Sequence, residues 1–434
     1  MKKLHVIIVF LILAFGLSAY QADVKFTDSW DKQGLNIEEQ NDVNLKLNYS
    51  ITQFYFEDIA IDNENLTNIQ LPGVFLPNDE GMPNLPGSSR FIAIPQGAKA
   101  ELHIIDYRIE RYSDIEIAPA PRIPLDTEDG PLEYSKNNEI YSRNANYPEN
   151  FIQLSEPSKL RGVDVVMLGI TPFQYNPVSK ELIVYRDIKF EVSFSGGNGH
   201  FGEDRLRNRW WDPILKDAIL NQSILPDIDY NSRELTRDGA EYLIICPNDA
   251  TFITWANTIK DFRQQQGIST IIKTTTEIGG NTVSAIETYV DNAYNNWSTP
   301  PAAVLLLGDY GDTGSTITSE WYSHPAGYPN FVSDNKFADV APEDNLPDIV
   351  FARITANNAT ELGTMITKFI NYETNPPTDV NFYDHPITAL GWQTERWFQI
   401  CSEAVGGYLS NELSKTPVRI NAIYSGNPTT DPWS

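Results

Sequence analysis

The first half of the chain alternates apolar and polar residues in short runs that end at turn signals. The clearest alternation covers residues 101–119 and 181–196, and a looser one covers 163–177. Glycine-, proline- and asparagine-rich segments separate these runs, at 77–87, 95–98, 175–180 and 195–199. Alternation with period two is typical of strands that bury one face, and frequent turns favour a sandwich or barrel. We therefore predict a β-rich domain over 20–237.

The pattern changes at residue 241, where continuous apolar runs begin to alternate with amphipathic segments. The predicted strands are 241–247, 269–276, 301–309 and 347–354, and the predicted helices are 248–267, 281–297 and 357–374. Continuous apolar strands are typical of sheets covered on both faces. Alternation of strands and helices predicts a parallel, doubly wound α/β domain over 238–434, with functional groups at the carboxyl ends of its strands. Asp309 lies at one such end.

The segment between the two patterns reads as a connector. Residues 200–223 have a mixed pattern that fits a short helix, and residues 229–241 are polar and carry Arg233 and Arg237. Exposed basic tips of this kind suit proteolytic cleavage. We predict the domain boundary here, with Arg237 as the first choice of cut site and Arg233 as the second; a plain interdomain loop is the alternative.

The first residues have the pattern of an export signal. A basic start, Met1-Lys2-Lys3, precedes an apolar stretch over 4–15 and then small residues. This is typical of a secretory signal peptide, which we assign to residues 1–19. No later apolar run approaches the length of about 18 residues that a membrane-spanning helix needs. The sequence therefore predicts a secreted or cell-surface protein without a transmembrane segment.

The charge composition bears on which class of partner the protein binds. The formal net charge is −26, with 32 Lys and Arg against 58 Asp and Glu. This balance argues against nucleic acid as a partner, because phosphate binding needs clustered cations. It fits an extracellular protein or one with acidic cation sites. The chain has only two cysteines, Cys246 and Cys401, so it does not rest on a disulfide framework, and one bridge or two separate thiols both remain open.

Loop acids are the candidate metal ligands. Asp309 ends a predicted strand, and Asp344 and Asp348 precede the next one in a proline-containing loop. Such oxygen ligands suit Ca²⁺, and solvated loop acids are the alternative. The histidines are too scattered for a zinc site. The glycine-rich stretch 308–314 lacks the Lys-Ser/Thr ending of a phosphate loop, and its acids would repel phosphate.

The residues alone show no convincing nucleophile and base. Cys246 falls within a buried strand and reads as core. Cys401 reads as helical, and His385 lies sixteen residues before it in a loop, which we interpret as chance placement. Glu395 follows a predicted strand and could orient a histidine, as the third member of a triad does.

The order of these segments resembles the gingipain family of cysteine peptidases, of clan CD with a caspase-like fold. In the second half the resemblance runs through EYLIIC, VLLLGD, FVSDNKFADVAPEDNLPDIVFARI and ALGWQTERWFQICSEAVGGYL. In the first half, GMPNLPGSSRFIAIPQGA and RGVDVVMLGITPFQYNPVSKELIVYRDIKFEVSF resemble the family's propeptide. The resemblance covers most of the chain.

The resemblance implies a structural calcium ion at Asp309, Asp344 and Asp348, and an orienting role for Glu395. It also implies a catalytic histidine in a His-Gly-Ser turn and a cysteine that ends the next strand. No histidine follows His385, and His-Gly-Ser is absent. We therefore expect the printed chain to stop before the catalytic dyad and to be inactive. Glu403 is one candidate for the acid that selects basic substrate residues.

The leading interpretation is the front portion of a secreted cysteine endopeptidase zymogen that acts on proteins and peptides. Its own propeptide would serve as inhibitor until a cut at Arg237 or Arg233 releases it. The alternative is a non-enzymatic secreted binding or surface protein that keeps the fold, and a remoter one is a nucleotide-dependent enzyme. The gene beyond codon 434 discriminates the first two: a His-Gly-Ser followed by a strand and a cysteine supports the peptidase.

Overall fold

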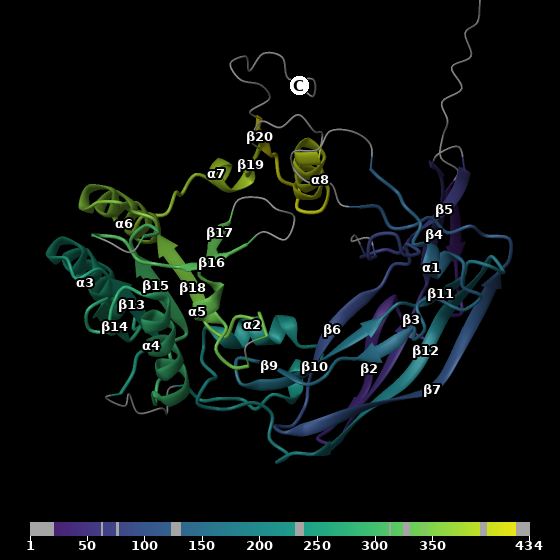
Figure 1. Cartoon of the computed structure of the whole chain (residues 1–434), viewed down its shortest axis with the longest axis horizontal. Helices are drawn as coiled ribbons and strands as arrows, with labels where there is room; N and C mark the ends of the chain where they lie inside the picture. Colours follow the sequence, from purple (N-terminus) through teal and green to yellow (C-terminus); the bar gives the residue numbers. More distant parts are fainter. Residues whose placement is uncertain are drawn as a thin grey trace, which may run out of the picture.

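A computed structural model describes residues 21–61, 64–74, 78–122, 132–230, 238–311, 314–323, 330–342, 344–390 and 397–421. These residues form an antiparallel β-rich first half and an α/β second half, which lie beside one another (Figure 1). The predicted change of architecture after the β-rich half is therefore confirmed. Signal-peptide residues 1–19 fall outside the described residues, as do the proposed cut sites Arg233 and Arg237.

Three antiparallel sheets build the first half. Their strand orders are β1-β4-β5, β6-β10-β8 with β9 also on β10, and β11-β12-β3-β2 with β7 also on β12. The strands are β1 Gln21–Lys25, β2 Gly34–Gln40, β3 Asn44–Ser50, β4 Gln53–Ile61, β5 Glu64–Gln70, β6 Ser88–Ala93, β7 Ala98–Tyr112, β8 Ile152–Leu154, β9 Ser158–Leu160, β10 Val163–Ile170, β11 Phe173–Asn176 and β12 Glu181–Gly196. One short helix, α1 Asn138–Tyr141, lies between β7 and β8.

One continuous hydrophobic core holds these sheets together. It takes alternate residues from the strands, such as Leu45 and Leu47 of β3 and Phe190 and Val192 of β12. Alternation of this kind is what the sequence pattern predicts for strands with one buried face. The long pairing of β7 with β12 contains register shifts, one of them between Tyr185 and Asp187.

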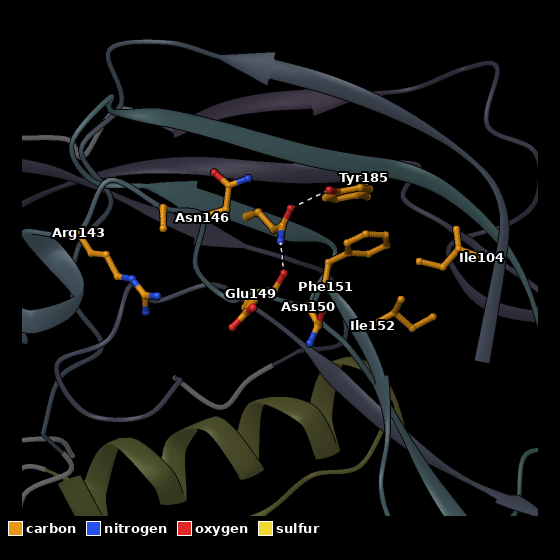
Figure 2. A pocket seen from close by; sticks show the side chains of 10 residues that line it. Ile104, Arg143, Asn146, Glu149, Asn150, Phe151, Ile152 and Tyr185 are labelled. Carbon is orange, nitrogen blue, oxygen red and sulfur yellow. Dashed lines mark hydrogen bonds between the residues drawn. The ribbon is translucent and has the colours of Figure 1, made fainter. Parts of the chain in front are cut away.

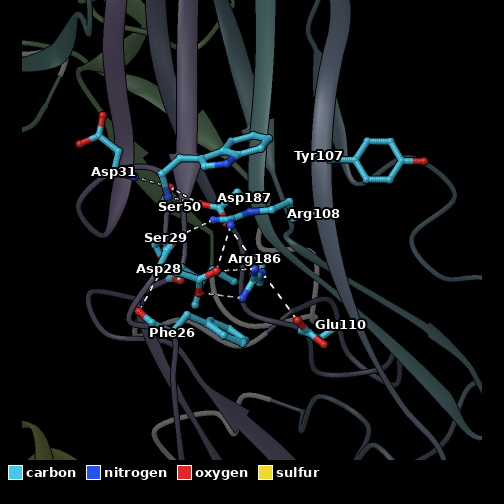
Figure 3. A network of polar contacts seen from close by, with 12 residues as sticks. Phe26, Asp28, Ser29, Asp31, Ser50, Tyr107, Arg108, Glu110, Arg186 and Asp187 are labelled. Atoms are coloured by element: carbon cyan, nitrogen blue, oxygen red, sulfur yellow. Dashed lines mark hydrogen bonds and ion pairs between the residues drawn. The ribbon is translucent and has the colours of Figure 1, made fainter.

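At that shift a buried carboxylate organises a polar network (Figure 3). Asp187 is fully buried and accepts hydrogen bonds from the Trp30 backbone N–H at 2.8 Å, the Ser50 hydroxyl at 2.7 Å and the Arg108 Nε at 2.9 Å. Arg108 also contacts Asp28, which lies near the surface. A buried charge is tolerated only when it is paired and hydrogen-bonded, and here the network fixes the amino-terminal segment onto the β7–β12 ribbon.

A four-stranded parallel sheet forms the centre of the second half. Its order is β14-β13-β15-β18, and every neighbouring pair is parallel. The elements are β13 Tyr242–Cys246, α3 Ala250–Gln265, β14 Thr270–Thr274, α4 Val283–Asn296, β15 Ala303–Leu307, α5 Asn335–Ala338, β18 Val350–Ile354 and α6 Ala359–Thr374. These bounds agree with the predicted strands and helices to within a few residues.

Helices cover both faces of this sheet (Figure 1). Leu243 and Ile245 of β13 pack in the core that includes α4, whereas Ile244 and Cys246 pack in the core that includes α3 and α6. Helices α3 and α6 approach closely because a Cβ on Gly363 would come within 2.5 Å of the Trp255 ring. Successive strand residues thus face opposite helical layers, which explains the continuous apolar runs.

The remaining elements lie around these two halves. Helix α2 Trp211–Ala218 and the 3-10 turn η1 Gln222–Ile224 form the predicted connector. An antiparallel pair joins β16 Glu320–Tyr322 with β17 Phe331–Ser333, and a parallel pair joins β19 Ile387–Leu390 with β20 Val418–Asn421. The last helices are α7 Val380–Asp384 and α8 Trp397–Asn411. Among the residues placed by the structure, none forms a helix long and apolar enough to cross a membrane.

Candidate functional site

The carboxyl edge of the parallel sheet is the candidate site. Strands β13, β15 and β18 all end there because they run in parallel. The chain passes from β13 to β14 on one side and then returns to β15 on the other, so the strand order reverses between β13 and β15. Ligands of open α/β sheets bind at such a reversal, outside the carboxyl ends of the strands. Asp309 follows β15 at this edge, as the sequence predicts.

A tight loop after β15 shapes the edge. Gly308 has φ +148, and a Cβ there would come within 2.9 Å of the Ser315 carbonyl oxygen, so the close approach requires glycine. The Asp309 N–H donates to the Ala356 carbonyl at 3.0 Å, and the Ile317 N–H donates to the Asp309 carbonyl at 2.9 Å. Among the described residues, the Asp309 side chain accepts a local hydrogen bond, from the Tyr310 N–H at 2.8 Å. The backbone of this loop is therefore fixed, while the Asp309 carboxylate stays half-exposed.

Arg353 of β18 ties this edge together. Its guanidinium forms a two-pronged ion pair with Asp334, through Nε at 2.9 Å and Nη2 at 2.7 Å. The same group donates to four backbone carbonyls, those of Gly308 at 3.1 Å, Asp309 at 3.4 Å, Ile317 at 2.8 Å and Thr318 at 3.0 Å. The planar fork of arginine suits several fixed acceptors at once. Arg353 thereby joins β18, the loop after β15 and the segment before α5.

Sequence reasoning missed this role, although a signal was present. Arg353 is a charged residue inside the otherwise apolar strand Val350–Ile354, and its side chain is only 10 % exposed. Charged residues are almost never buried unless they are paired. An arginine in a buried strand therefore predicts an acidic partner nearby, which the structure identifies as Asp334.

An aromatic hairpin flanks the edge. Trp321 of β16 packs edge-on against Tyr310, with ring centroids 5.5 Å apart, and its indole N–H donates to the Tyr310 hydroxyl. Tyr322 stacks on Phe331 of β17. Trp321 is 53 % exposed and Phe331 is 45 % exposed. The hairpin thus presents apolar surface beside the carboxyl ends of the strands. Its three-residue strands gave no periodic signal in the sequence.

The three predicted calcium ligands are not brought together. Asp309 lies at the carboxyl edge, whereas Asp348 precedes β18 at the amino edge. The Asp309 N–H is hydrogen-bonded to Ala356, which follows Asp348 by eight residues. Eight residues span about 25 Å along a strand. Asp344 lies near Asp348, and its carboxylate accepts hydrogen bonds from the Ser158 hydroxyl and, at 2.9 Å, from the Leu346 N–H. A single ion does not reach all three side chains in this arrangement.

The partners of Asp348 also do not suit a metal. Its Oδ1 accepts from the Arg161 N–H and the Tyr294 hydroxyl, both at 3.2 Å. Its Oδ2 accepts from the N–H groups of Val340 at 3.0 Å and Ala341 at 2.9 Å. A carboxylate has about four lone-pair sites, and four donors fill them. Over the described ranges, no group of three or more His, Cys, Asp and Glu side chains is arranged to hold a metal ion. Calcium binding at Asp309 stays a prediction.

Neither thiol has the environment of a nucleophile. Cys246 is buried, and desolvation raises the pKa of its thiol to about 12, so it is not ionised at neutral pH. Cys401 is exposed on α8. The ring Nδ1 of His385 lies 2.8 Å from the Asn381 carbonyl, and within the described part of the chain no thiol is hydrogen-bonded to an imidazole.

The structure describes Glu403 but not Glu395, the two acids predicted near the end of the chain. Glu395 lies outside the described residues, and its orienting role stays a prediction. Glu403 pairs with Arg419 through two bonds of 2.6 Å. The Glu403 carboxylate is therefore paired with a cation of this chain, and its role in selecting basic substrate residues stays a prediction.

A separate pocket opens in the first half (Figure 2). Its volume is about 400 Å³, and residues of the first half line it. Phe151 and Tyr185 stack with ring centroids 3.7 Å apart, and the Tyr185 hydroxyl donates to Gln174 at 2.7 Å. Arg143 and Glu149 supply the charged part of the lining. The described lining contains neither the thiol nor the imidazole of a cysteine peptidase dyad.

Two family models match the chain in succession. The model of peptidase family C25 matches residues 235–423, and the model named Propeptide_C25 matches residues 30–206. Together they cover most of the α/β half and most of the β-rich half. Arg233 precedes the match to the peptidase model, and Arg237 lies just inside that match.

Curated relatives agree with these matches. Gingipain R1 of Porphyromonas gingivalis is 26 % identical over 349 residues, which is 76 % of this chain and 33 % of the relative. Lys-gingipain HG66 of the same species is 23 % identical over 438 residues, 96 % of this chain and 24 % of the relative. The chain thus spans about a third or less of these two relatives.

One similar solved structure is the complex of the Porphyromonas gingivalis RgpB pro- and mature domains. It is 21 % identical, covers 43 % of this chain and 97 % of that chain, and has a TM-score of 0.39. The structure of the Arg-specific cysteine proteinase gingipain R is also 21 % identical, covers 44 % of this chain and 43 % of that chain, and has a TM-score of 0.33.

Proposed function

Since this chain belongs to peptidase family C25 and carries that family's propeptide, we propose that it is the zymogen portion of an exported cysteine endopeptidase. The observation that carries the proposal is the tandem match of propeptide and peptidase models to two structurally distinct halves. The apolar stretch at residues 4–15 supports export. The substrates are proteins and peptides.

The reaction is nucleophilic attack by a cysteine thiolate on a peptide carbonyl. Such a thiolate needs a histidine within hydrogen-bond reach, and main-chain N–H groups stabilise the developing oxyanion. Cys246 is excluded by its burial, and Cys401 lacks an imidazole partner among the described residues. We therefore assign neither Cys246 nor Cys401 as the nucleophile of the catalytic histidine–cysteine pair. The carboxyl edge held by Arg353 supplies one wall of their cleft, with Glu395 as the orienting acid.

The propeptide region keeps the enzyme inactive until export. In this proposal it covers the cleft and is separated by a cut at Arg237 or Arg233, between the bodies of the two family matches. The β-rich half has a continuous core, to which the α/β half adds Ala302, and we expect this half to remain compact after the cut.

The test is to express the full gene product and measure cleavage of fluorogenic peptides. Peptidase activity that iodoacetamide abolishes, together with a His-Gly-Ser and a later cysteine in the gene, would support the proposal. A gene that ends at codon 434 and a product without activity would favour the alternative, a secreted binding protein that keeps the fold.

A further inference from the structure

The two matched regions meet at the amino edge of the parallel sheet, opposite the candidate site. Here the turn after β9 contacts Asp348, which precedes β18, and α2 contacts Ala302, which precedes β15. The Trp211 indole N–H donates to the Ala302 carbonyl at 2.9 Å, just before β15. Arg205 donates to the carbonyls of Tyr294 at 2.7 Å and Trp297 at 3.0 Å, at the end of α4. Arg205 and Trp211 both precede the segment 231–237, so these contacts join the two sides of the expected cut.

Arg161 stands at the centre of this contact, on a tight hairpin turn. Strands β9 and β10 pair from Leu160 to Val163, which leaves Arg161 and Gly162 as the two loop residues. Both have positive φ, +48 for Arg161 and +73 for Gly162. Turns with two positive φ angles favour Asn, Asp or Gly, and for other residues this conformation costs about 1–2 kcal/mol. The cost is offset by what the Arg161 side chain contacts.

The side chain of Arg161 crosses into the peptidase region and is fully buried there. Its Nη1 donates to two carbonyls of that region, Pro301 and Asp348, both at 2.9 Å. Its Nε donates to the Leu206 carbonyl at 2.9 Å, on its own side of the cut. The backbone N–H of Arg161 donates to the Asp348 carboxylate at 3.2 Å. One residue thus makes three hydrogen bonds across the contact.

Two aromatic rings enclose the same guanidinium. Its carbon lies 5.4 Å from the Trp211 ring centroid and 5.0 Å from that of Tyr294. Cations near aromatic faces are stabilised most when they are desolvated. Burial lowers the pKa of Arg161 to about 10, which leaves the group charged at neutral pH. The cation is therefore held by three carbonyls and two rings.

We propose that Arg161 is the anchor that binds the propeptide region to the peptidase region at the amino edge of its sheet. The inference rests on the proposed function, because it assigns the two sides of the contact to propeptide and peptidase. The anchor lies at the edge opposite the carboxyl ends of the strands, so holding the propeptide and covering the cleft are separate tasks. A cut within 231–237 leaves the anchor intact, and the cut fragment stays bound.

Arg161 has the properties of a binding hot spot. Such residues are desolvated, lie at the centre of a contact and are often Arg, Trp or Tyr. Arg209 is a useful contrast to Arg161. It also contacts the peptidase region, by donating to the Gly267 carbonyl at 2.7 Å, but its side chain is 42 % exposed. Exposed contacts of this kind contribute little. We therefore expect the affinity to depend on Arg161.

The test uses the full chain with a sequence-specific protease site placed within 231–237. After the cut, dissociation of the two fragments is followed by dilution and size-exclusion chromatography. Fragments of the otherwise unchanged chain are expected to co-elute. Arg161→Met is expected to weaken their binding by at least about 30-fold, which corresponds to about 2 kcal/mol. Arg90→Met is the matched control, because Arg90 is exposed on β6, and it should bind like the unchanged chain.

Circular dichroism before the cut verifies that each variant is folded. If Arg161→Met does not fold, Arg161→Lys takes its place, since it keeps the charge but loses the fork, and it should weaken binding about 10-fold. Fragments that stay together equally well with and without Arg161, or that separate at once in the unchanged chain, would overturn the anchor. The readout needs no peptidase activity, so an inactive gene product whose fragments bind through Arg161 would overturn the proposed function alone.

Discussion

Arg353 holds the candidate edge through six contacts, and Arg353→Lys tests that role. Arginine donates here to both Asp334 oxygens and to four backbone carbonyls. Lysine has three donors on a single nitrogen, so at least three of these contacts are lost. The lost set includes one prong of the ion pair and two carbonyl contacts. The charge is unchanged, so the variant isolates the geometry of the fork.

The expected loss follows from those contacts. A hydrogen bond to a charged group contributes about 1.5–3 kcal/mol, and a neutral one contributes about 0.5–1.5 kcal/mol. For three lost contacts we expect a decrease of about 3 kcal/mol in the free energy of unfolding of the α/β half. For a region of this size, that corresponds to a Tm lower by about 6–12 °C.

The assay is urea unfolding combined with hydrogen exchange. Exchange of peptides from β15 and β18 identifies the transition that belongs to the α/β half. Arg111→Lys is the control, because Arg111 pairs with Glu181 at the surface, where its side chain is 55 % exposed, and it should change stability by less than about 0.5 kcal/mol. If Arg353→Lys also changes the free energy of unfolding by less than about 0.5 kcal/mol, the assigned role of Arg353 is wrong.

Three further predictions concern other groups. Burial acts to raise the pKa of Asp212, but hydrogen bonds from Arg207 and Tyr230 hold that pKa below its usual value. Because the folded chain lowers the pKa of Asp212, this pairing stabilises the fold above about pH 4, and the stabilisation declines as the pH falls further. Asp212→Asn should therefore lower the free energy of unfolding in urea by about 2 kcal/mol at pH 7 and by less at pH 3; an equal decrease at both would contradict the assignment. Removal of calcium with EGTA should lower the Tm if Asp309 holds an ion, and Asp309→Asn should abolish that effect; an unchanged Tm counts against calcium there. In the native chain a thiol reagent should label one cysteine quickly and the other only on unfolding, because Cys401 is exposed and Cys246 is buried; rapid labelling in Cys401→Ser would show that Cys246 is accessible.

The strands and helices of the second half were predictable because their signals are local. Continuous apolar runs define β13 and β15, and helix faces such as that of Ile286, Val290 and Tyr294 recur at helical spacing. The placement of Asp309 after β15 follows from the same pattern. In the first half, alternation predicted the long strands, whereas strands of three residues such as β8 and β9 lie below what periodicity detects.

The role of Asp348 was not predictable from its own neighbourhood. Its sequence context, a proline-containing acidic loop, suggested calcium. Two of the four donors that fill its carboxylate come from Arg161 and Tyr294, which are 187 and 54 residues away in the sequence. Such partners are set by how the two halves pack, and a single sequence carries no direct signal of that packing. Arg353 is the opposite case, since an isolated charge in an apolar strand signals a buried partner.

The amino-terminal sequence of the activated gene product shows whether a cut separates the β-rich half from the α/β half. We expect the full product, once it cleaves peptides at its maximum rate, to have a new amino terminus within residues 230–242. Maximum activity from a chain that is still uncut between the β-rich half and the α/β half would contradict it.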